Sequence, residues 1–291
     1  KHQKRTTARN DSNFLADAKF QYIRHYQPYL PDGLNNNYRY KCLAYQEWRN
    51  LFEAGKLTGA AKQFYEPKSV EHLYDCEADP HQVNNLAGDS KYAATLVELR
   101  KRLQEKVKQL PDLSFYPESY LAERAMDNPV GFGQARKSEI AVLVDTADLA
   151  LLSFEEAKPR LRKALKSDNP MIRYWAAMAC TSFGKTASEL AIDVRPLLKD
   201  EAMTVRIRSA EFLGLIGDIN PQTVLTEVVN TSDNPVVATE ALNSVVWFRD
   251  FFDDRYPVSR SDFRPASKGA DIDDRLNYIN GVPYPPKAKR K

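Results

Sequence analysis

Two hydrophobic patterns divide the chain near residue 130. Residues 18–26, "AKFQYIRHY", alternate between two faces with a period of two and are rich in aromatic side chains, which predicts a β-strand. Residues 73–76 form a second strand-like run. After residue 130 the apolar positions instead follow the spacing of helices. The pattern therefore predicts a mixed α and β segment followed by an all-helical one.

Helical spacing also appears around the second strand. Gly55 is a typical helix stop after one apolar series, and a short helical piece precedes Pro67. Residues 92–110 trace one face of an amphipathic helix that ends at Pro111. The series before Gly55 consists of Tyr45, Trp48, Leu51 and Phe52.

The first segment, residues 1–125, is thus predicted to be a small antiparallel sheet plus helices, an α+β subdomain. The loop "YLPDGLNNNY" separates its first strand from its first helix because Pro, Asp, Gly and Asn favour turns. So few strands do not make a stable independent sheet, and we expect this subdomain to lean on something larger.

The stretch "LYDCEADPHQVNNLAGD" at residues 73–89 needs its own interpretation. Asp79-Pro80 is a turn initiator, because proline fixes φ and disfavours helix in the residue before it. Val83 and Leu86 follow at i, i+3 spacing. The pattern predicts a strand, a tight turn and a one-turn helix that holds Leu86 against an apolar surface.

The second segment, residues 137–250, contains an internal repeat. "SDNPMIRYWAAMACTSFG", "KDEAMTVRIRSAEFLGLIG" and "SDNPVVATEALNSVVWF" superimpose at steps of roughly 31 to 33 residues. Each has a polar cap and then an apolar helix, with partner helices predicted in 193–200 and 222–230 and an earlier unit in 139–165. This is an α-solenoid pattern. The repeats align two columns: Ile172, Val205 and Val236, and Ala177, Ala210 and Ala241.

The last segment, residues 251–291, is predicted to be an extended tail that docks on the rest of the chain. Five large apolar residues precede its basic end, and three prolines disfavour a helix. The apolar residues are Leu276, Tyr278, Ile279, Val282 and Tyr284, and the prolines are Pro283, Pro285 and Pro286.

Composition narrows the classes of function. With 291 residues, 43% of them hydrophobic, the chain can bury a large core in about two domains. The net charge of +3 has its signs interspersed, which argues against a nucleic-acid partner. No apolar run approaches the roughly 20 residues that span a bilayer. Because the first residue is Lys rather than Met, we expect a fragment or a processed portion, and the missing targeting signal says nothing about the compartment.

The three cysteines indicate no zinc site and no disulfide framework, because their number is odd and no CxxC pair occurs. Cys42, Cys76 and Cys180 are predicted to be buried free thiols.

The stretch "LYDCEADPHQVNNLA" resembles the C-terminal signature of type I, formylglycine-dependent sulfatases, a Leu-Tyr-Asp strand followed by D-P-x-E-x-x-N-L-A. Gln82 stands where the family usually has glutamate. "KFQYIRHYQPYLP" resembles the family's preceding strand and loop, and "EWRNLFEAGKLTGAAKQFYEPKSVEHLYD" resembles the region between the strands. The resemblance covers about residues 1–120, and the repeats after it resemble short HEAT repeats. The matching signature residues are Asp79, Pro80, Asn85, Leu86 and Ala87.

The resemblance also implies where the chemistry lies. Sulfatases use a formylglycine, made from Cys or Ser in a C/S-x-P/A-S-R motif, beside a calcium ion. None of the three cysteines lies in such a motif. The resemblance therefore implies that formylglycine and calcium belong to an N-terminal catalytic domain before Lys1. No catalytic residue, metal ligand or cofactor is assigned in this chain, and the chain alone is predicted to be inactive.

The resemblance implies candidates for substrate binding in "KHQKRTTARNDSN", because in the family the segment before the first strand carries side chains that face the active-site pocket. A cationic cluster suits a sulfated sugar. A solvated loop is the alternative, and His25, His72 and His81 are predicted to be structural. The candidates are His2, Lys4, Arg5 and Arg9.

Two functional hypotheses follow. The first is the C-terminal part of a sulfatase that acts on sulfated glycans, with an α+β sulfatase C-terminal subdomain followed by an all-α HEAT-like solenoid. Its partners are then its own N-terminal sulfatase domain and a sulfated carbohydrate, and the resemblance implies a periplasmic or secreted location. The alternative is a non-catalytic HEAT-repeat protein-interaction module with a sulfatase-like end.

Overall fold

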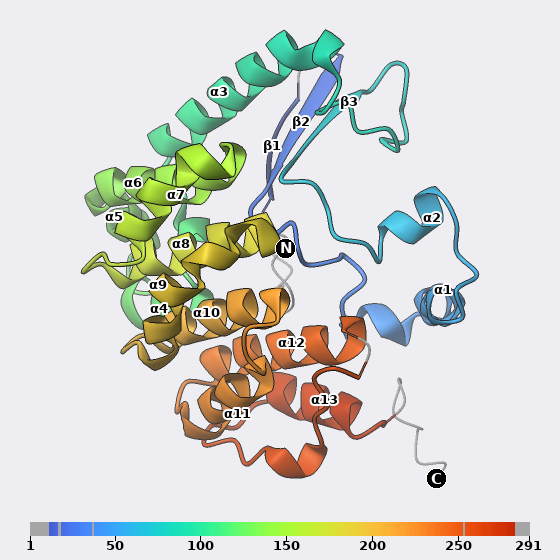
Figure 1. Cartoon of the computed structure of the whole chain (residues 1–291), viewed down its shortest axis with the longest axis vertical. Helices are drawn as coiled ribbons and strands as arrows, with labels where there is room; N and C mark the ends of the chain where they lie inside the picture. Colours follow the sequence, from blue (N-terminus) through green and yellow to red (C-terminus); the bar gives the residue numbers. More distant parts are fainter. Residues whose placement is uncertain (1–11, 17–18, 37, 253, 283–291) are drawn as a thin grey trace. The chain divides into compact units, whose positions relative to one another are not determined.

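The structure is a computed structural model that describes residues 12–16, 19–36, 38–252 and 254–282 (Figure 1). It is helical for the most part, with one small antiparallel sheet, as the sequence predicts. Within the described residues, no helix is long and apolar enough to cross a membrane.

The chain forms two compact units that interleave in sequence. One combines Asn10–Tyr29 with Lys68–Val194 and contains the sheet, and we call it the sheet unit. The other, the C-terminal unit, combines Leu30–Pro67 with the stretch from Arg195 onward. These units are groupings in space, and the division into segments 1–125, 137–250 and 251–291 stays a prediction.

The sheet unit contains a three-stranded antiparallel sheet of order β1-β2-β3. The strands are β1 (Ser12–Ala16), β2 (Phe20–His25) and β3 (Glu71–Asp75). The second and third confirm the two predicted strands, whereas β1 was not predicted. Tyr22 pairs with Leu73 in the register of the two predicted strands, and both side chains are buried. The centre of the sheet therefore belongs to the core.

Helices of the sheet unit supply the surface on which this small sheet packs. Helix α3 (Ala93–Gln109) confirms the predicted amphipathic helix and lies against β1 and β2 (Figure 1). It buries Leu96, Leu99, Leu103 and Val107. The other helices of this unit are α4 (Glu118–Arg124), α5 (Pro129–Ala135), α6 (Lys137–Ala147), α7 (Phe154–Ala164), α8 (Pro170–Phe183) and α9 (Ala191–Val194). Its 3₁₀ turns are Ser90–Tyr92, Leu113–Phe115, Asp148–Leu151 and Gly184–Leu190.

A buried ion pair joins the sheet to these helices. Arg24 of β2 donates from Nε to Asp148 Oδ1 at 3.0 Å and from Nη2 to the Ala147 carbonyl at 2.9 Å. Gln104 of α3 donates to the other Asp148 oxygen at 2.8 Å. A buried charge without a partner costs several kcal/mol, so this pair holds β2, α3 and the end of α6 in one arrangement.

The C-terminal unit is all-helical within its described residues. Helices α1 and α2 confirm the two helical pieces predicted before Pro67, and Gly55 follows α1 with a positive φ of 67°. The helices of this unit are α1 (Leu43–Glu53), α2 (Ala60–Gln63), α10 (Met203–Ile216), α11 (Pro221–Thr231), α12 (Pro235–Phe251) and α13 (Ala270–Ile279), with 3₁₀ turns at Arg39–Lys41, Arg195–Lys199 and Arg260–Asp262.

Polar side-chain caps begin two of the three predicted repeat helices, α8 and α12, and also the partner helix α11, whereas α10 follows Ala202 without a side-chain cap. The side chains of Asn169, Asn220 and Asn234 each accept a hydrogen bond from the backbone N–H two residues on, and proline occupies the first helical position. Proline lacks an N–H and its φ suits the first turn of a helix, so the Asn-Pro pair defines where each helix starts.

Small residues in the repeats allow close packing. Ala177, Ala210 and Ala241 are each 0% exposed, which confirms the predicted column. At Gly214 of α10, an added Cβ would lie 2.6 Å from Pro221 Cγ, so any larger residue there would push α11 away.

The prediction of an extended C-terminal tail is wrong for its first part. Residues 270–279 form α13, which buries Ile272, Leu276 and Ile279 at helical spacing. The prolines that argued against a helix all follow Val282 and lie outside the described residues. Docking of Leu276 and Ile279 is confirmed, but it occurs through one face of a helix that packs on α12 (Figure 1).

Replacing Ala210 with Phe is expected to destabilise the protein by about 1–3 kcal/mol, because a larger side chain overpacks a filled contact. Thermal or urea unfolding of the intact chain measures this. Ala94→Phe, at an exposed position of α3, is the matched control. Equal unfolding midpoints for the two variants would contradict the alignment of the repeats.

Replacing Asp148 with Asn is expected to cost about 3–5 kcal/mol, because it leaves the Arg24 guanidinium buried without its counterion. Asp145→Asn, in the last turn of the preceding α6, is the control, since Asp145 pairs with Lys108 at the surface and such pairs contribute less than about 1 kcal/mol. Urea unfolding at neutral pH compares the two. Similar losses would show that Arg24 does not depend on this carboxylate.

Candidate functional site

The predicted substrate contacts cannot be placed. His2, Lys4, Arg5 and Arg9 all lie outside the described residues. Their role in binding a sulfated sugar therefore stays a prediction.

The signature stretch begins with a turn built on Asp75, the last residue of β3. Its Oδ1 accepts hydrogen bonds from the backbone N–H groups of Ala78 at 3.0 Å and Glu77 at 3.1 Å. The Ala78 N–H and the nearby Lys19 ammonium lower the pKa of Asp75. The Asp75 carboxylate thus takes up the backbone N–H groups that follow β3, which ends the strand and starts the turn.

The one-turn helix predicted after Asp79-Pro80 does not form. Asp79 Oδ2 instead accepts hydrogen bonds from the N–H groups of Val83 at 2.8 Å and Asn84 at 2.7 Å. Gln82 has a positive φ of 55°, which interrupts any helical run. Local side-chain bonds to the backbone therefore outcompete the helix that the i, i+3 spacing predicted.

Asn85 fastens this loop to β3. Its Oδ1 accepts from the N–H groups of Leu73 and Ala87, both at 3.0 Å, and its Nδ2 donates to the Glu71 carbonyl at 3.2 Å. The Leu86 N–H also donates to the Leu73 carbonyl at 2.8 Å. These bonds satisfy backbone groups on the edge of β3 that lacks a neighbouring strand. The signature residues Asp79, Asn85 and Leu86 thus form an edge cover, and the geometry assigns them no catalytic role.

Two of the histidines predicted to be structural contact each other, His25 being buried and His72 partly buried. His25 Nε2 lies 3.3 Å from His72 Nδ1, and the Tyr74 hydroxyl lies 2.8 Å from the same Nδ1. Burial raises the pKa of the Tyr74 hydroxyl, with the Asp79 carboxylate adding to the effect. Across the part of the chain that the structure describes, no three His, Cys, Asp or Glu side chains gather as a metal site would require.

The prediction of buried thiols is correct for one cysteine. Cys180 is buried in α8, and its surroundings raise the pKa of the thiol. Cys42 is exposed at the N-cap of α1, a helix that buries none of its residues. Cys76 is partly exposed. All three are free.

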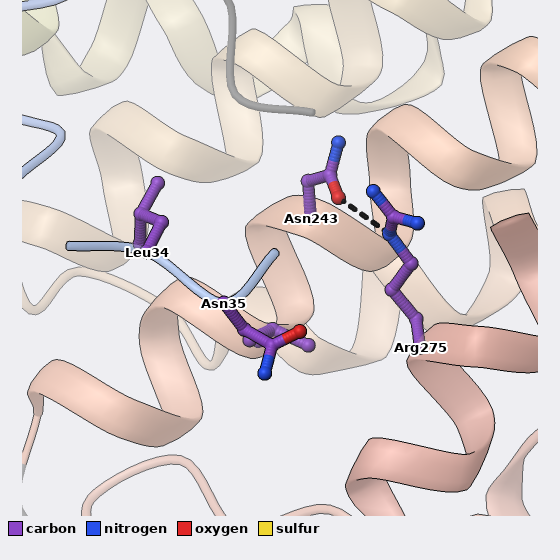
Figure 2. Close-up of a pocket in the computed structure, with 5 residues that line it drawn as sticks. Leu34, Asn35, Asn243 and Arg275 are labelled. Carbon is purple, nitrogen blue, oxygen red and sulfur yellow. Dashed lines mark hydrogen bonds between the residues drawn. The ribbon is translucent and has the colours of Figure 1, made fainter. Parts of the chain in front are cut away.

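A small pocket lies in the C-terminal unit (Figure 2). Arg275 of α13 donates from Nε to Asn243 Oδ1 of α12 at 2.9 Å, and Leu34, Asn35 and Val246 complete the lining. The pocket measures about 10 Å³, room for about one water molecule. It is too small for a sugar, so it is no substrate site.

An arginine cluster that the sequence did not reveal holds α1 in place. Arg49 Nη2 donates to Asp250 Oδ2 of α12 at 2.8 Å and to the Tyr278 hydroxyl of α13 at 2.6 Å. Tyr278 in turn donates to Asp250 at 2.8 Å. No local signal in the sequence finds this cluster, because its members are more than 25 residues apart.

Comparisons with known proteins confirm both resemblances. Residues 159–245 match the HEAT repeat family. Over 111 residues the chain is 37% identical to the "Ulvan-active sulfatase" of Formosa agariphila. That match covers 38% of this chain and 19% of the relative, so the chain spans about a fifth of the relative's length. No solved structure matches the chain significantly.

Replacing Asn85 with Ala is expected to destabilise the protein by about 1–2 kcal/mol, because three hydrogen bonds of about 1 kcal/mol each are lost and water restores part of them. Asn84→Ala is the control, since the Asn84 side chain is adjacent in sequence but takes no part in the edge cover. Thermal unfolding measures the stability, and amide hydrogen exchange at Leu73 should accelerate only in Asn85→Ala. Unchanged exchange at Leu73 would contradict the edge cover.

Proposed function

We propose that this chain is the non-catalytic C-terminal part of a sulfuric ester hydrolase that acts on sulfated glycans. The main support is the 37% identity to a sulfatase over 111 residues. The folded signature loop adds to it, because Asp79 and Asn85 have defined structural tasks that explain why this pattern of residues occurs together.

The catalytic chemistry is assigned to a domain outside this chain. Sulfate ester hydrolysis requires a nucleophile, a cation that polarises the sulfate oxygens and donors for the developing charge. The described residues do not fit a calcium site, because no group of three possible ligands gathers among them. Cys42 is exposed, but it lies in "CLAYQ" and lacks the motif that formylglycine formation requires. We therefore derive no step of hydrolysis from residues of this chain.

The HEAT repeats are proposed to brace the hydrolase. Helix α10 buries ten of its fourteen residues, polar ones included, as expected of a packing element rather than a free binding surface. A periplasmic or secreted location follows by resemblance from the same proposal. The rival function, a HEAT-repeat interaction module without catalysis, predicts a different outcome in the experiment below.

The native protein tests the proposal. Antibodies raised against the recombinant chain are used to precipitate the native protein from the cells and culture medium of its source. We expect a polypeptide larger than 33.2 kDa that releases sulfate from ulvan and loses this activity with a calcium chelator. The recombinant chain alone should release none.

Two results would overturn the proposal. A native polypeptide of 33.2 kDa without sulfate release would favour the interaction module. Chelator-sensitive turnover by the pure recombinant chain would show that catalysis lies within it.

A further inference from the structure

Helix α1 of the C-terminal unit carries an aromatic face although none of its residues is buried. Tyr45 and Trp48 lie on this helix, and Phe64 follows α2. Tyr38, just before the helix, is 76% exposed, and Leu43 is 75% exposed. Large apolar side chains left together at a surface mark a binding surface more often than they occur by chance. We call Tyr38, Tyr45, Trp48 and Phe64 the aromatic shelf.

Three rings of the aromatic shelf, those of Tyr45, Trp48 and Phe64, pack against one another. Trp48 stacks on Phe64 with ring centroids 4.5 Å apart and an interplanar angle of 18°. The Trp48 indole N–H donates to the Ala61 carbonyl at 2.9 Å, and the Tyr45 ring lies 6.0 Å from Trp48. A surface with its side chains already ordered loses little entropy when a ligand binds.

Cations border the aromatic shelf. The Arg39 guanidinium lies 5.0 Å from the Phe64 ring centroid and 5.8 Å from that of Tyr45. Two residues on, Lys41 is exposed. Arg39 donates a hydrogen bond to the Asp32 backbone carbonyl, and Lys41 interacts electrostatically with the Asp274 carboxylate.

The charge of this segment is also one-sided. Residues 38–67 carry five cations against three carboxylates, and two of these carboxylates are already neutralised, Glu53 by Arg49 and Glu66 by Lys62. The third, Glu47, is exposed on α1. The segment thus combines ring faces with an excess of positive charge, which complements a ligand that has apolar faces and fixed negative charge.

We propose that the aromatic shelf with Arg39 and Lys41 binds a sulfated sugar residue of a polysaccharide. The apolar face of the sugar ring lies on the aromatic rings, and Arg39 and Lys41 donate hydrogen bonds to the sulfate oxygens. The class of ligand rests on the proposed function, while the surface itself rests on the geometry above. An open surface can accommodate a polymer chain, whereas the pocket beside Arg275 has room for only about one water molecule.

Tryptophan fluorescence reports on this surface selectively. Trp175 and Trp247 are each 2% exposed, so a ligand in solution contacts neither. The intact chain is titrated with chondroitin sulfate, and unsulfated chondroitin of the same length is the matched ligand control. We expect a saturable change in fluorescence with chondroitin sulfate and at least tenfold weaker binding of chondroitin.

Variants connect the signal to named side chains. Tyr38→Ala should weaken binding at least threefold, and Arg39→Gln should weaken it at least tenfold. Arg39→Lys should bind more tightly than Arg39→Gln, because it keeps the positive charge. Arg160→Gln is the control, because Arg160 is an exposed cation on α7 of the sheet unit with the same formal charge. Its affinity should match that of the unchanged chain. Circular dichroism and the melting midpoint confirm that each variant is folded.

Three results would overturn the proposal: equal binding of chondroitin and chondroitin sulfate, equal losses in Arg39→Gln and Arg160→Gln, or no loss in Tyr38→Ala and Arg39→Gln together. The second would mean that bulk positive charge attracts the polymer, and the third that the shelf serves another occupant such as a protein. Failure of the hydrolase proposal is detected in a different experiment. The native protein would then release no sulfate, whatever the aromatic shelf binds.

Discussion

The buried charge of Arg24 is the constraint on which the sheet unit depends. A guanidinium in a core requires a counterion and hydrogen-bond acceptors. Asp148, 124 residues away in the sequence, is the counterion of Arg24. The partners of Arg24 come from the end of α6 and the turn that follows it, while Gln104 of α3 orients the same carboxylate. A three-stranded sheet is marginal by itself, and this network commits it to one position on the helices.

Aromatic packing extends the same dependence to the first repeat helix. Tyr26, just after β2, contacts Phe115 at 5.2 Å and Trp175 of α8 at 5.6 Å between ring centroids. The Trp175 indole N–H donates to the Phe115 carbonyl at 2.8 Å, so its polar atom is satisfied in the core. The sulfatase-like strand and a helix of the HEAT match therefore share one core within this unit. A change that destabilises β2 is therefore expected to destabilise α8 as well, and the reverse.

Local signals account for what the sequence predicted. The period of two predicted β2, helical spacing predicted α1 and α3, and polar caps predicted the starts of α8 and α12, because each signal acts over a few residues. The failures involve competition that no local pattern contains. Asp79 and Asn85 bind backbone groups and displace a helix, and α13 forms because its apolar face meets α12. The candidate binding surface shows the same limit, since helical spacing predicted α1 but did not indicate that Tyr45 and Trp48 stay partly exposed.

The partly exposed aromatic face of α1 is compatible with a rigid structure because Arg49 anchors the helix. Arg49 lies in α1 itself and is bound by Asp250 and Tyr278, which come from two different helices. Its guanidinium also lies 5.3 Å from the Tyr40 ring and 5.4 Å from the Tyr278 ring. Charge-assisted bonds of this kind hold a helix without requiring its apolar residues to be buried. Of the aromatic side chains of α1, Phe52 also attaches the helix, because its ring contacts Phe251 of α12 at 6.3 Å between centroids. Tyr45 and Trp48 stay partly exposed, which leaves them available for a ligand.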